Sequence, residues 1–599
     1  MPVVAEQGAM DIPQALIAML DGEQGVTRQK AARLVLDLAS TAEAVGFVEI
    51  DHAHVAGVSV LTGGNGLRQF LADISSDPDG RVTVPTTLNS AGCDADQFAA
   101  MGIADEGFLE HQFEIIRAYE QLGISATLSC TPYDTELQLD DGCAAWAESN
   151  AVCFSNSWTG LHTNRESGLS ALGSAITGYA PVWGLLIDAN RWPNIVVDVR
   201  GEFEDPCDLS LLGDWIGKQV RPGWNLPFGP MPWIRGLLEA CGGRLSFDER
   251  KALTSAAANH GCPMLWVDGV SEAPEGFDPD STDPRIQGRI DFDTDELDWL
   301  YDDLAPQGTV DLVVIGCPQA SLGEVRSAAA SVRTRMELGQ KIPDQRLWVF
   351  TSRHNHAQAE AEGTTELLEE AGALVLIDTC PEVTPYDRRR FNHLLTNSMK
   401  AEHYLTSGLN RMPTSVARMD DCISHAFDPE LARGPRPTLE EGGSATRPSS
   451  KTHRDDIATF TGLSLPSQDS WRINGLALVT DVPITWLGYV NRETGVIEHP
   501  GHPLDGQSVE GRILIYPKGS GSTVAPYVLM GLFYSGRGPL AVVNSDVCPL
   551  TLPACSLLGI PYAHGFTEDP CLGVNSGDEV DMWLEDGVVT LQTVQRAQQ

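Results

Sequence analysis

Basic residues are scarce in this 599-residue chain. Lysine and arginine together number 40 against 82 aspartates and glutamates, which gives a formal net charge of -42 at pH 7. Nucleic-acid binding depends on clustered cations that contact phosphates, and the basic stretches here, such as DRRRF at 387–391, are short. The composition therefore argues against a nucleic-acid partner and favours small-molecule ligands.

Long hydrophobic runs are also lacking. The longest, such as GALVLI at 372–377, are much too short to cross a bilayer, and no basic-plus-apolar signal opens the sequence. We therefore expect a cytoplasmic protein without a membrane partner. The 13 cysteines, an odd number, predict thiols that serve as core residues or metal ligands in a reducing compartment rather than as disulfides.

Three cysteines share the same local setting. Cys130, Cys317 and Cys380 each follow a short apolar run and are followed by proline within two residues. The apolar runs are typical of buried parallel strands, and sites in open α/β sheets form beyond the carboxyl ends of such strands. The pattern predicts that these three thiols converge on a metal or cluster site.

The chain divides into two regions of different character. Residues 1–430 alternate strand and helix patterns, which predicts a large, multi-layer α/β region, and 466–599 predict a smaller, β-rich α/β domain. Between them, residues 431–465 are rich in proline, glycine, serine and charge without apolar periodicity, as expected of a linker. No internal repeat is evident.

A glycine- and serine-rich loop is the strongest motif of the second region. In 512–532 (RILIYPKGSGSTVAPYVLMGL) an apolar strand leads into the loop and then into a helix. Such a loop presents N–H groups and hydroxyls that suit a carboxylate, a phosphate or an ionised serine, although Ser522 or Thr523 could simply cap the helix. The loop does not have the GxxxxGK[ST] order of a Walker loop. It also has no histidine or aspartate beside it, as a serine hydrolase motif would, and no histidine of the kind that a phospho-carrier phosphorylates.

Two polar segments follow strand-like runs in the first region. In 163–166 the guanidinium of Arg165 could hold a substrate carboxylate while Thr163 and Asn164 orient it, or the segment is an ordinary helix entry with Glu166 paired to Arg165. The segment 84–89 (VPTTLN) is either a second set of ligands or a turn.

The motifs taken together in chain order resemble aconitase X. HVAGVSVLTGGNGLRQF, VPTTLNSAGCD, SCTPYDTELQLDDGCAAWAESNAVCFSNSWTGLHTNRES, IGCPQASLGE, DTCPE, KGSGSTV and GRGPLAVVNSDVCPL cover nearly the whole chain outside the linker, with the large and small swivelling parts fused. The resemblance implies that Cys130, Cys317 and Cys380 bind an iron–sulfur cluster, with [2Fe-2S] favoured, and that Ser522 is the base. It also implies a substrate pocket formed by Thr87, Asn89, Tyr133, Thr163, Asn164, Arg165, Glu166, Ser520 and Thr523.

The single-chain organisation resembles bacterial cis-3-hydroxy-L-proline dehydratases. We therefore expect an iron–sulfur-dependent hydro-lyase, monomeric or weakly homo-oligomeric, that forms 1-pyrroline-2-carboxylate from this hydroxy amino acid. A serine acts as a base only if its alkoxide is stabilised, here by loop amides, the helix amino end and Lys518. The alternatives are another hydroxy acid, such as mevalonate 5-phosphate, or a non-catalytic iron–sulfur redox sensor.

Two positions depart from the expected pattern. Cys93 is either a fourth ligand or a buried thiol, and we favour the thiol. Gln319 stands where a histidine is expected after the proline, so a contact to substrate or cluster could differ.

Overall fold

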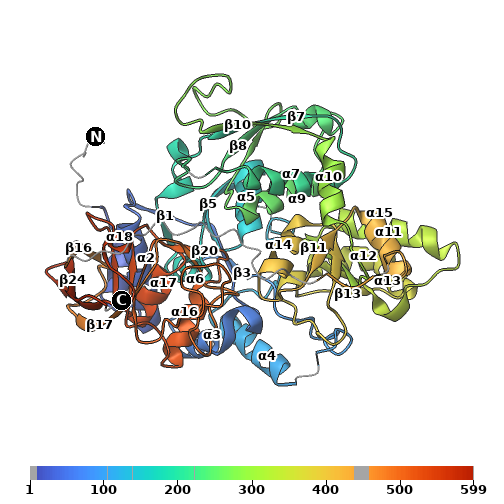
Figure 1. Cartoon of the computed structure of the whole chain (residues 1–599). Coiled ribbons are helices and arrows are strands. Elements are labelled where there is room, and N and C mark those ends of the chain that lie inside the picture. Colours follow the sequence, from blue (N-terminus) through green and yellow to red (C-terminus); the bar gives the residue numbers. More distant parts are fainter. Residues whose placement is uncertain are drawn as a thin grey trace.

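The computed structural model describes residues 10–597 apart from 104, 105, 138, 222, 433 and 438–456. Most of the predicted linker therefore lies outside the described residues. Figure 1 shows three α/β layers and a β-rich part that contacts the first of them. None of the helices in the described ranges is long and apolar enough to span a membrane.

The first α/β layer is a four-stranded, fully parallel sheet in the order β3-β2-β4-β5. Short strands with buried residues alternate with helices, as the strand-then-helix pattern predicts. The strands are β2 (His52–Val55), β3 (Thr86–Leu88), β4 (Asp141–Trp146) and β5 (Gly160–Arg165), and the helices are α2 (Val26–Thr41), α3 (Val60–Ser75), α4 (Glu106–Gln121), α5 (Ser149–Trp158) and α6 (Gly168–Thr177).

The second layer has four parallel strands in the order β10-β7-β8-β9. Its sheet is covered by α7 and α9, which pack against each other, and α9 also packs against α5 of the first layer. The elements are β7 (Ile195–Arg200), α7 (Pro206–Lys218), β8 (Pro232–Arg235), α9 (Phe247–Asn259), β9 (Trp266–Val267) and β10 (Gly288–Asp293).

The third layer is a five-stranded parallel sheet in the order β13-β12-β11-β14-β15. Its central strand is buried along its whole length, as its continuous apolar sequence predicts. The strands are β11 (Leu312–Ala320), β12 (Leu347–Thr351), β13 (Leu374–Leu376), β14 (Leu394–Thr396) and β15 (Thr414–Val416), and the helices are α11 (Leu322–Met336), α12 (Arg353–Ala361), α13 (Thr364–Ala371), α14 (Met399–Ser407) and α15 (Met419–Phe427).

The carboxyl-terminal part is a closed barrel in the order β16-β22-β21-β19-β17-β23-β24. Its first strand begins at Thr459, within the segment assigned to the linker. The elements are β16 (Thr459–Ser464), β17 (Arg472–Val479), β19 (Ile513–Tyr516), β20 (Gly519–Ser520), α16 (Pro526–Tyr534), β21 (Ala541–Asn544), α17 (Leu552–Leu558), β22 (Tyr562–His564), β23 (Glu579–Glu585) and β24 (Val588–Gln595).

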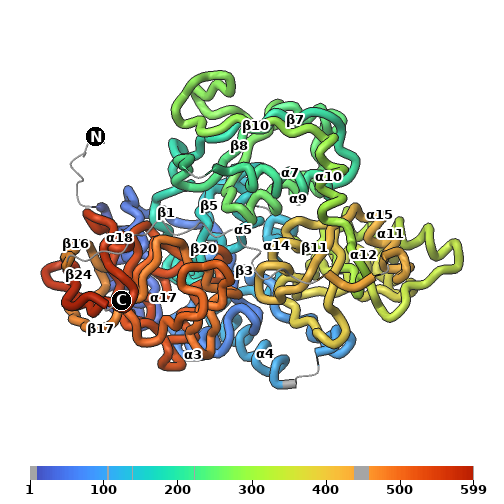
Figure 2. Tube along the Cα trace, viewed as in Figure 1, coloured from blue at the N-terminus to red at the C-terminus, as the bar shows by residue number. Residues whose placement is uncertain are grey.

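The barrel domain and the first layer share one hydrophobic core. Leu67 and Phe70 of α3 lie in the same buried cluster as Tyr527 and Val528 of α16. The blue helices α2 and α3 and the orange segments α16 and α17 accordingly lie side by side in Figure 1 and Figure 2. This packing brings the Ser522 loop (residues 519–524) against the α/β layers.

Candidate active site

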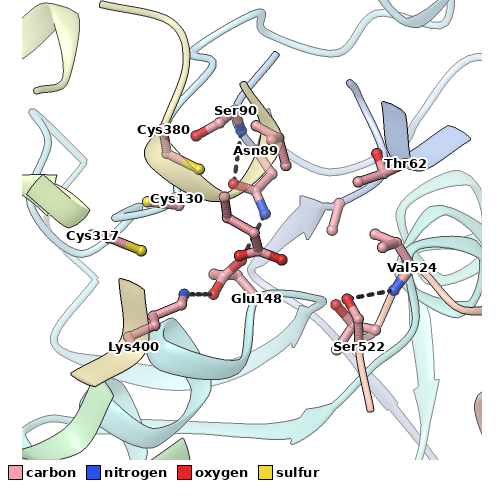
Figure 3. Close-up of a pocket in the computed structure, with 15 residues that line it drawn as sticks. Thr62, Asn89, Ser90, Cys130, Glu148, Cys317, Cys380, Lys400, Ser522 and Val524 are labelled. Carbon is pink, nitrogen blue, oxygen red and sulfur yellow. Dashed lines mark hydrogen bonds and ion pairs between the residues drawn. The ribbon is translucent and has the colours of Figure 1, made fainter. Parts of the chain in front are cut away.

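The three predicted thiols and the Ser522 loop line one pocket. Cys130, Cys317 and Cys380 are only 3%, 4% and 5% exposed, and they lie on one side of it. Ser522 lies on the opposite side (Figure 3), beside Thr62 of α3. The fold therefore places the thiols of the α/β layers opposite the serine of the barrel domain.

Each thiol is positioned by a different segment. Cys317 lies within β11, and the hydroxyl of Ser398, which caps α14, donates to its carbonyl oxygen. Cys380 follows β13 and directly precedes the 3-10 turn Pro381–Val383. Cys130 ends a stretch of the first layer that makes only an isolated bridge, between Thr87 and Ser125, where the sequence predicts a strand.

The thiols are electronically unequal. The hydrogen bond with Cys380 and the nearby Lys400 ammonium lower the pKa of Cys130 to about 7, and Cys130 Sγ also accepts the N–H of Gln319 at 3.3 Å. Burial raises the pKa of Cys317 well above its usual value. A thiolate is the form that binds metals, and the hydrogen bond between Cys130 and Cys380 favours a thiolate on one member of this pair.

A buried ion pair lies between the two sides of the pocket. Lys400 Nζ is 2.6 Å from Glu148 Oε1, and Glu148 caps the amino end of α5 by accepting the N–H of Asn150. Lys400 is in the first turn of α14 and is 2% exposed. A charge buried this deeply requires a partner, and each residue supplies the other's.

Two amides complete the shell around Glu148. Asn89 Nδ2 donates to Oε2 at 2.8 Å, and Asn150 Nδ2 donates to Oε1 at 2.6 Å. Burial alone would raise the pKa of Glu148, but Lys400 and these amides lower it to about 2. Asn150 also donates to the carbonyl oxygen of Cys130 at 3.1 Å, which links the ion pair to the thiols.

The Ser522 loop is anchored to the end of β5 and to the start of α6. Arg165 Nη2 donates to the carbonyl oxygen of Gly521 at 3.1 Å, and the N–H of Gly168 donates to that of Thr523 at 3.1 Å. Ser522 Oγ accepts the N–H of Val524 at 3.4 Å, just before α16 begins. The hydroxyl therefore faces the pocket at the positive end of a helix.

The structure brings together only part of the predicted substrate set. Asn89 and Thr523 line the pocket, and Arg165 contacts the loop that carries Ser522. The remaining predicted side chains do not line it: Thr87, Tyr133, Thr163, Asn164, Glu166, Ser520 and Lys518.

Of these residues, Tyr133 supports the pocket indirectly, whereas Thr87 faces elsewhere. Thr87 Oγ1 hydrogen-bonds to His54 Nδ1 at 2.8 Å, and Thr87 faces a different cavity. The Tyr133 hydroxyl donates to Asn150 Oδ1 at 2.8 Å, and Asn150 in turn contacts Glu148. Tyr133 thus supports the pocket without entering it.

The side chains of Thr163 and Asn164 in β5 and of Glu166, which directly follows this strand, make mainly structural contacts. Thr163 Oγ1 accepts the N–H of Trp146 at 3.1 Å, and Asn164 Nδ2 donates to the carbonyl oxygen of Trp183 at 3.1 Å. Glu166 is buried, and burial raises its pKa above the usual range. These contacts fix the position of Arg165.

The two remaining loop residues are occupied elsewhere. Ser520 Oγ hydrogen-bonds to Thr485 Oγ1 at 2.7 Å. Lys518 Nζ lies 3.9 Å from Asp546, and both side chains are more than half exposed. Lys518 does not line the pocket, and its predicted role in stabilising a charge on Ser522 stays a prediction.

The sequence also places Glu148 in the polar cluster that includes Arg165, without assigning it a role, and it assigns no role to several other residues of the pocket. Glu148 lies two residues after β4 and Glu382 two residues after Cys380, so a position near a strand end could have indicated a role for both. Lys400 had no such signal, because it lies in the first turn of a helix without a local motif. Cys93 does not line the pocket; it lies in the same apolar cluster as Cys317 and Met101, and burial raises its pKa to about 12.

Gln319, the unexpected glutamine, connects the cysteine segments. Its side-chain amide donates to the carbonyl oxygens of Leu128, at 3.3 Å, and Thr379, at 2.9 Å. These residues lie two before Cys130 and one before Cys380. The glutamine therefore contacts backbone near the thiols rather than the pocket.

Family models match three segments of this architecture: the aconitase X first domain matches 9–189, the third domain 310–428 and the swivel domain 470–591. The large subunit of phosphomevalonate dehydratase from Methanothermobacter thermautotrophicus is 34% identical over 392 residues, which cover 65% of this chain and 92% of that subunit. The cis-3-hydroxy-L-proline dehydratase from Pseudomonas aeruginosa is 32% identical over 427 residues, 68% of each chain.

The small part has a separate relative. The phosphomevalonate dehydratase small subunit from Pyrococcus abyssi is 38% identical over 93 residues, which cover 16% of this chain and 72% of that subunit. The crystal structure of aconitase X from Thermococcus kodakaraensis in its holo form superposes with a TM-score of 0.61 at 30% identity and covers 70% of this chain and all of that one.

Residues of the first and third α/β layers and of the swivel barrel line one shared pocket. Together with the matched families and relatives, this arrangement places the protein among the dehydratases. The chain belongs to the aconitase X family: it is a hydro-lyase that combines, in one polypeptide, parts similar to the large and the small subunits. The holo form of the relative implies a cofactor in this family.

Proposed function

We propose that this enzyme dehydrates cis-3-hydroxy-L-proline to 1-pyrroline-2-carboxylate. The observation that supports the proposal most directly is the placement of the thiols and Ser522 on opposite sides of one pocket. In this substrate the 3-hydroxyl and the carboxylate share one ring face, so the C2 hydrogen lies on the other face and the elimination can be anti. Base and leaving-group acceptor must then approach from opposite sides.

The donor set fits an iron–sulfur cluster. Cys130, Cys317 and Cys380 would hold it, and three cysteines can leave one iron open. Among iron–sulfur clusters we favour [2Fe-2S]. When bound, the cluster supplies a Lewis acid that takes the charge of the departing hydroxide.

The protein's own groups account for the proton transfer. Ser522 takes the proton from C2, and the C–O bond at C3 breaks as the C2–C3 double bond forms. The Val524 N–H and the amino end of α16 stabilise the serine alkoxide. Arg165 holds the loop at Gly521. The enamine then tautomerises to 1-pyrroline-2-carboxylate.

Mevalonate 5-phosphate is the second candidate substrate. The relatives named phosphomevalonate dehydratase large subunit match this chain with 30–34% identity and are covered over 92–95% of their length. Dehydration of either compound needs the same base and leaving-group acceptor, so the pocket chemistry supports both.

Anaerobic purification with iron and sulfide analysis, followed by assay on both compounds, tests the proposal. We expect iron and sulfide in the protein and turnover of cis-3-hydroxy-L-proline. Ser522→Ala should keep the iron while kcat falls by about 10²–10⁴-fold, because a positioned base contributes that much. Ser535→Ala is the control, since this hydroxyl donates to the Leu532 carbonyl at the other end of α16. Iron-free protein that turns over neither compound would refute the proposal, and full activity in Ser522→Ala would exclude Ser522 as the base.

A further inference from the structure

Gln319 is a fully buried glutamine that belongs to one cysteine segment and contacts the other two. It lies two residues after Cys317 and is 0% exposed. Its main-chain N–H donates to Cys130 Sγ at 3.3 Å. Its side-chain amide donates to the carbonyl oxygens of Leu128, at 3.3 Å, and Thr379, at 2.9 Å. One residue therefore connects a thiol 189 positions earlier in the chain with a turn 60 positions later.

The nitrogen of the Gln319 amide is engaged twice, whereas the oxygen has no contact. Oε1 is buried and has no hydrogen-bond partner among the described residues. Turning the amide over would bring this oxygen against two carbonyl oxygens, so only the observed orientation supplies donors to both. An unpaired buried acceptor opposes folding. What Gln319 contributes is therefore two N–H donors in one place, and a neutral histidine offers only one.

The carbonyl groups that accept these donors belong to strained turns. Leu128 has φ 49°, and Asp378 has φ 66°. Left-handed backbone is uncommon for residues other than glycine, and it persists only where surrounding contacts hold it. Leu128 lies two residues before Cys130, and Asp378 two residues before Cys380. The hydrogen bonds from Gln319 end on Leu128 and on the residue after Asp378, so they hold the turns through which both cysteines are reached.

The main chain of Gln319 is fixed from the second α/β layer. Lys251 of α9 is 1% exposed, and its Nζ donates to the Gln319 carbonyl oxygen at 2.7 Å. The same ammonium pairs with Glu324 in the first turn of α11, whose carboxylate also accepts the N–H of Ser321 at 2.8 Å. These contacts do not involve the Gln319 side chain. Replacing that side chain should therefore release the other two cysteine segments and leave the end of β11 in place.

We propose that Gln319 is a positioning residue that holds the Cys130 and Cys380 segments against Cys317, at the spacing that an iron–sulfur cluster needs. Groups that orient metal ligands from outside contribute to how tightly the metal is held, and hydrogen bonds to the cysteine sulfurs tune a cluster. Gln319 does not line the pocket, so it acts through the thiols. The inference rests on the proposed function in taking these thiols to be cluster ligands.

The rate of iron loss tests this without requiring turnover. Gln319→Met has a similar length but no donor, and after anaerobic purification it should lose iron to an Fe²⁺ chelator at least 10-fold faster than the wild type. Its reduction potential should also shift, because the surroundings of Cys130 Sγ change. Gln319→His, with one N–H in its neutral form, should lose iron at an intermediate rate.

A glutamine of the swivel domain provides the matched control. Gln468 also joins backbone segments, since its amide donates to the Ile560 carbonyl oxygen at 2.7 Å and accepts the N–H of Tyr562 at 3.1 Å. Gln468→Met should lower the melting temperature, yet it should keep the iron-loss rate and the reduction potential of the wild type. Wild-type values of both in folded Gln319→Met would overturn the inference. If Gln319→Met does not fold, a wild-type rate of iron loss in Gln319→His would overturn it.

These measurements separate the inference from the proposed reaction. Protein that holds iron but turns over neither candidate substrate would refute the reaction, and the iron-loss rates would still test Gln319. If the wild type purifies without iron, the proposed function fails, and alkylation by iodoacetamide then tests Gln319 by itself. Mass spectrometry should find Cys130 and Cys380 alkylated at least 10-fold faster in Gln319→Met than in the wild type, and the buried swivel-domain thiol Cys548 alkylated equally. Equal rates at all three thiols would overturn the inference.

Discussion

At the scale of single residues, the pair formed by Lys400 and Glu148 sets the charge of the pocket. The ammonium and carboxylate are 2.6 Å apart and nearly inaccessible to water. Removing one partner of such a pair leaves a buried charge uncompensated, which typically costs about 3–5 kcal/mol. Removing both charges is much less costly.

A double-mutant cycle on this pair follows from that asymmetry. We expect Lys400→Gln to lower the free energy of unfolding by about 3–5 kcal/mol, and the double variant Lys400→Gln/Glu148→Gln to lower it by less. Urea unfolding of the four proteins measures the coupling. If the double variant loses as much stability as the two single variants together, the two side chains act independently and the ion-pair interpretation is wrong. The catalytic activity of the two single variants and of the double variant should be lower than that of the wild type.

The same residues show what the sequence could and could not predict about the site. Ser522 and Asn89 follow strands within recognisable motifs, and both line the pocket. Lys400 is brought there by the packing of α14 against the cysteine segments, which no local pattern encodes. Lys518 is only four residues before Ser522, yet its side chain faces Asp546. Proximity in sequence does not determine side-chain direction in a loop.

At the scale of elements, the contact between α3 and α16 determines where Ser522 lies. Gly66 of α3 lies directly against the backbone of α16, and a Cβ there would be 2.6 Å from the Cα of Gly531. A Cβ on Gly531 itself would meet nothing within 4 Å. Two helical glycines at one crossing are thus unequal in their tolerance of alanine.

This inequality gives a matched pair of variants. Gly66→Ala should separate the two helices and lower the melting temperature, because backbone atoms of α16 must move. Gly531→Ala should be neutral or stabilising by up to about 1 kcal/mol, since alanine is the better helix former. Calorimetry of both proteins measures the difference. If Gly66→Ala and Gly531→Ala destabilise the protein equally, the close approach of α3 to α16 at Gly66 is not the reason that glycine is needed there.

The sequence predicted these elements unevenly. The helix after Ser522 and the apolar run of β11 are confirmed, because periodicity and burial specify both locally. The run ISATLSC, which predicts a strand, makes only one isolated bridge. The division of the α/β region into three separate sheets was not predicted, since it depends on long-range pairing that alternating strands and helices alone leave open.

At the scale of the whole molecule, Asp37 of α2 joins the first α/β layer to the swivel domain. Its carboxylate accepts the N–H of Ser467 at 2.9 Å and the hydroxyls of Ser467, at 2.5 Å, and Ser556, at 2.6 Å. Burial raises its pKa from 3.8 to about 6, although these donors and Arg33 oppose the shift. The docked state therefore retains a proton that the unfolded chain loses.

This shift predicts how stability depends on pH. Because the pKa of Asp37 is higher in the folded than in the unfolded state, its contribution to the free energy of unfolding is fully present below about pH 4. This contribution is lost as the pH rises through about 6, and at higher pH Asp37 causes no further change in stability. The roughly two-unit difference sets an upper limit of about 3 kcal/mol. Asp37→Asn cannot ionise but can still accept the Ser467 N–H. The difference in melting temperature between Asp37→Asn and the wild type should therefore grow in favour of the variant from pH 4 to 7. Above pH 7 this difference should stay constant. Asp546→Asn, at an exposed position, is the control and should follow the wild type throughout. Parallel curves for Asp37→Asn and the wild type across this range would show that Asp37 is ionised in the docked state, and that the three serine hydrogen bonds outweigh its burial.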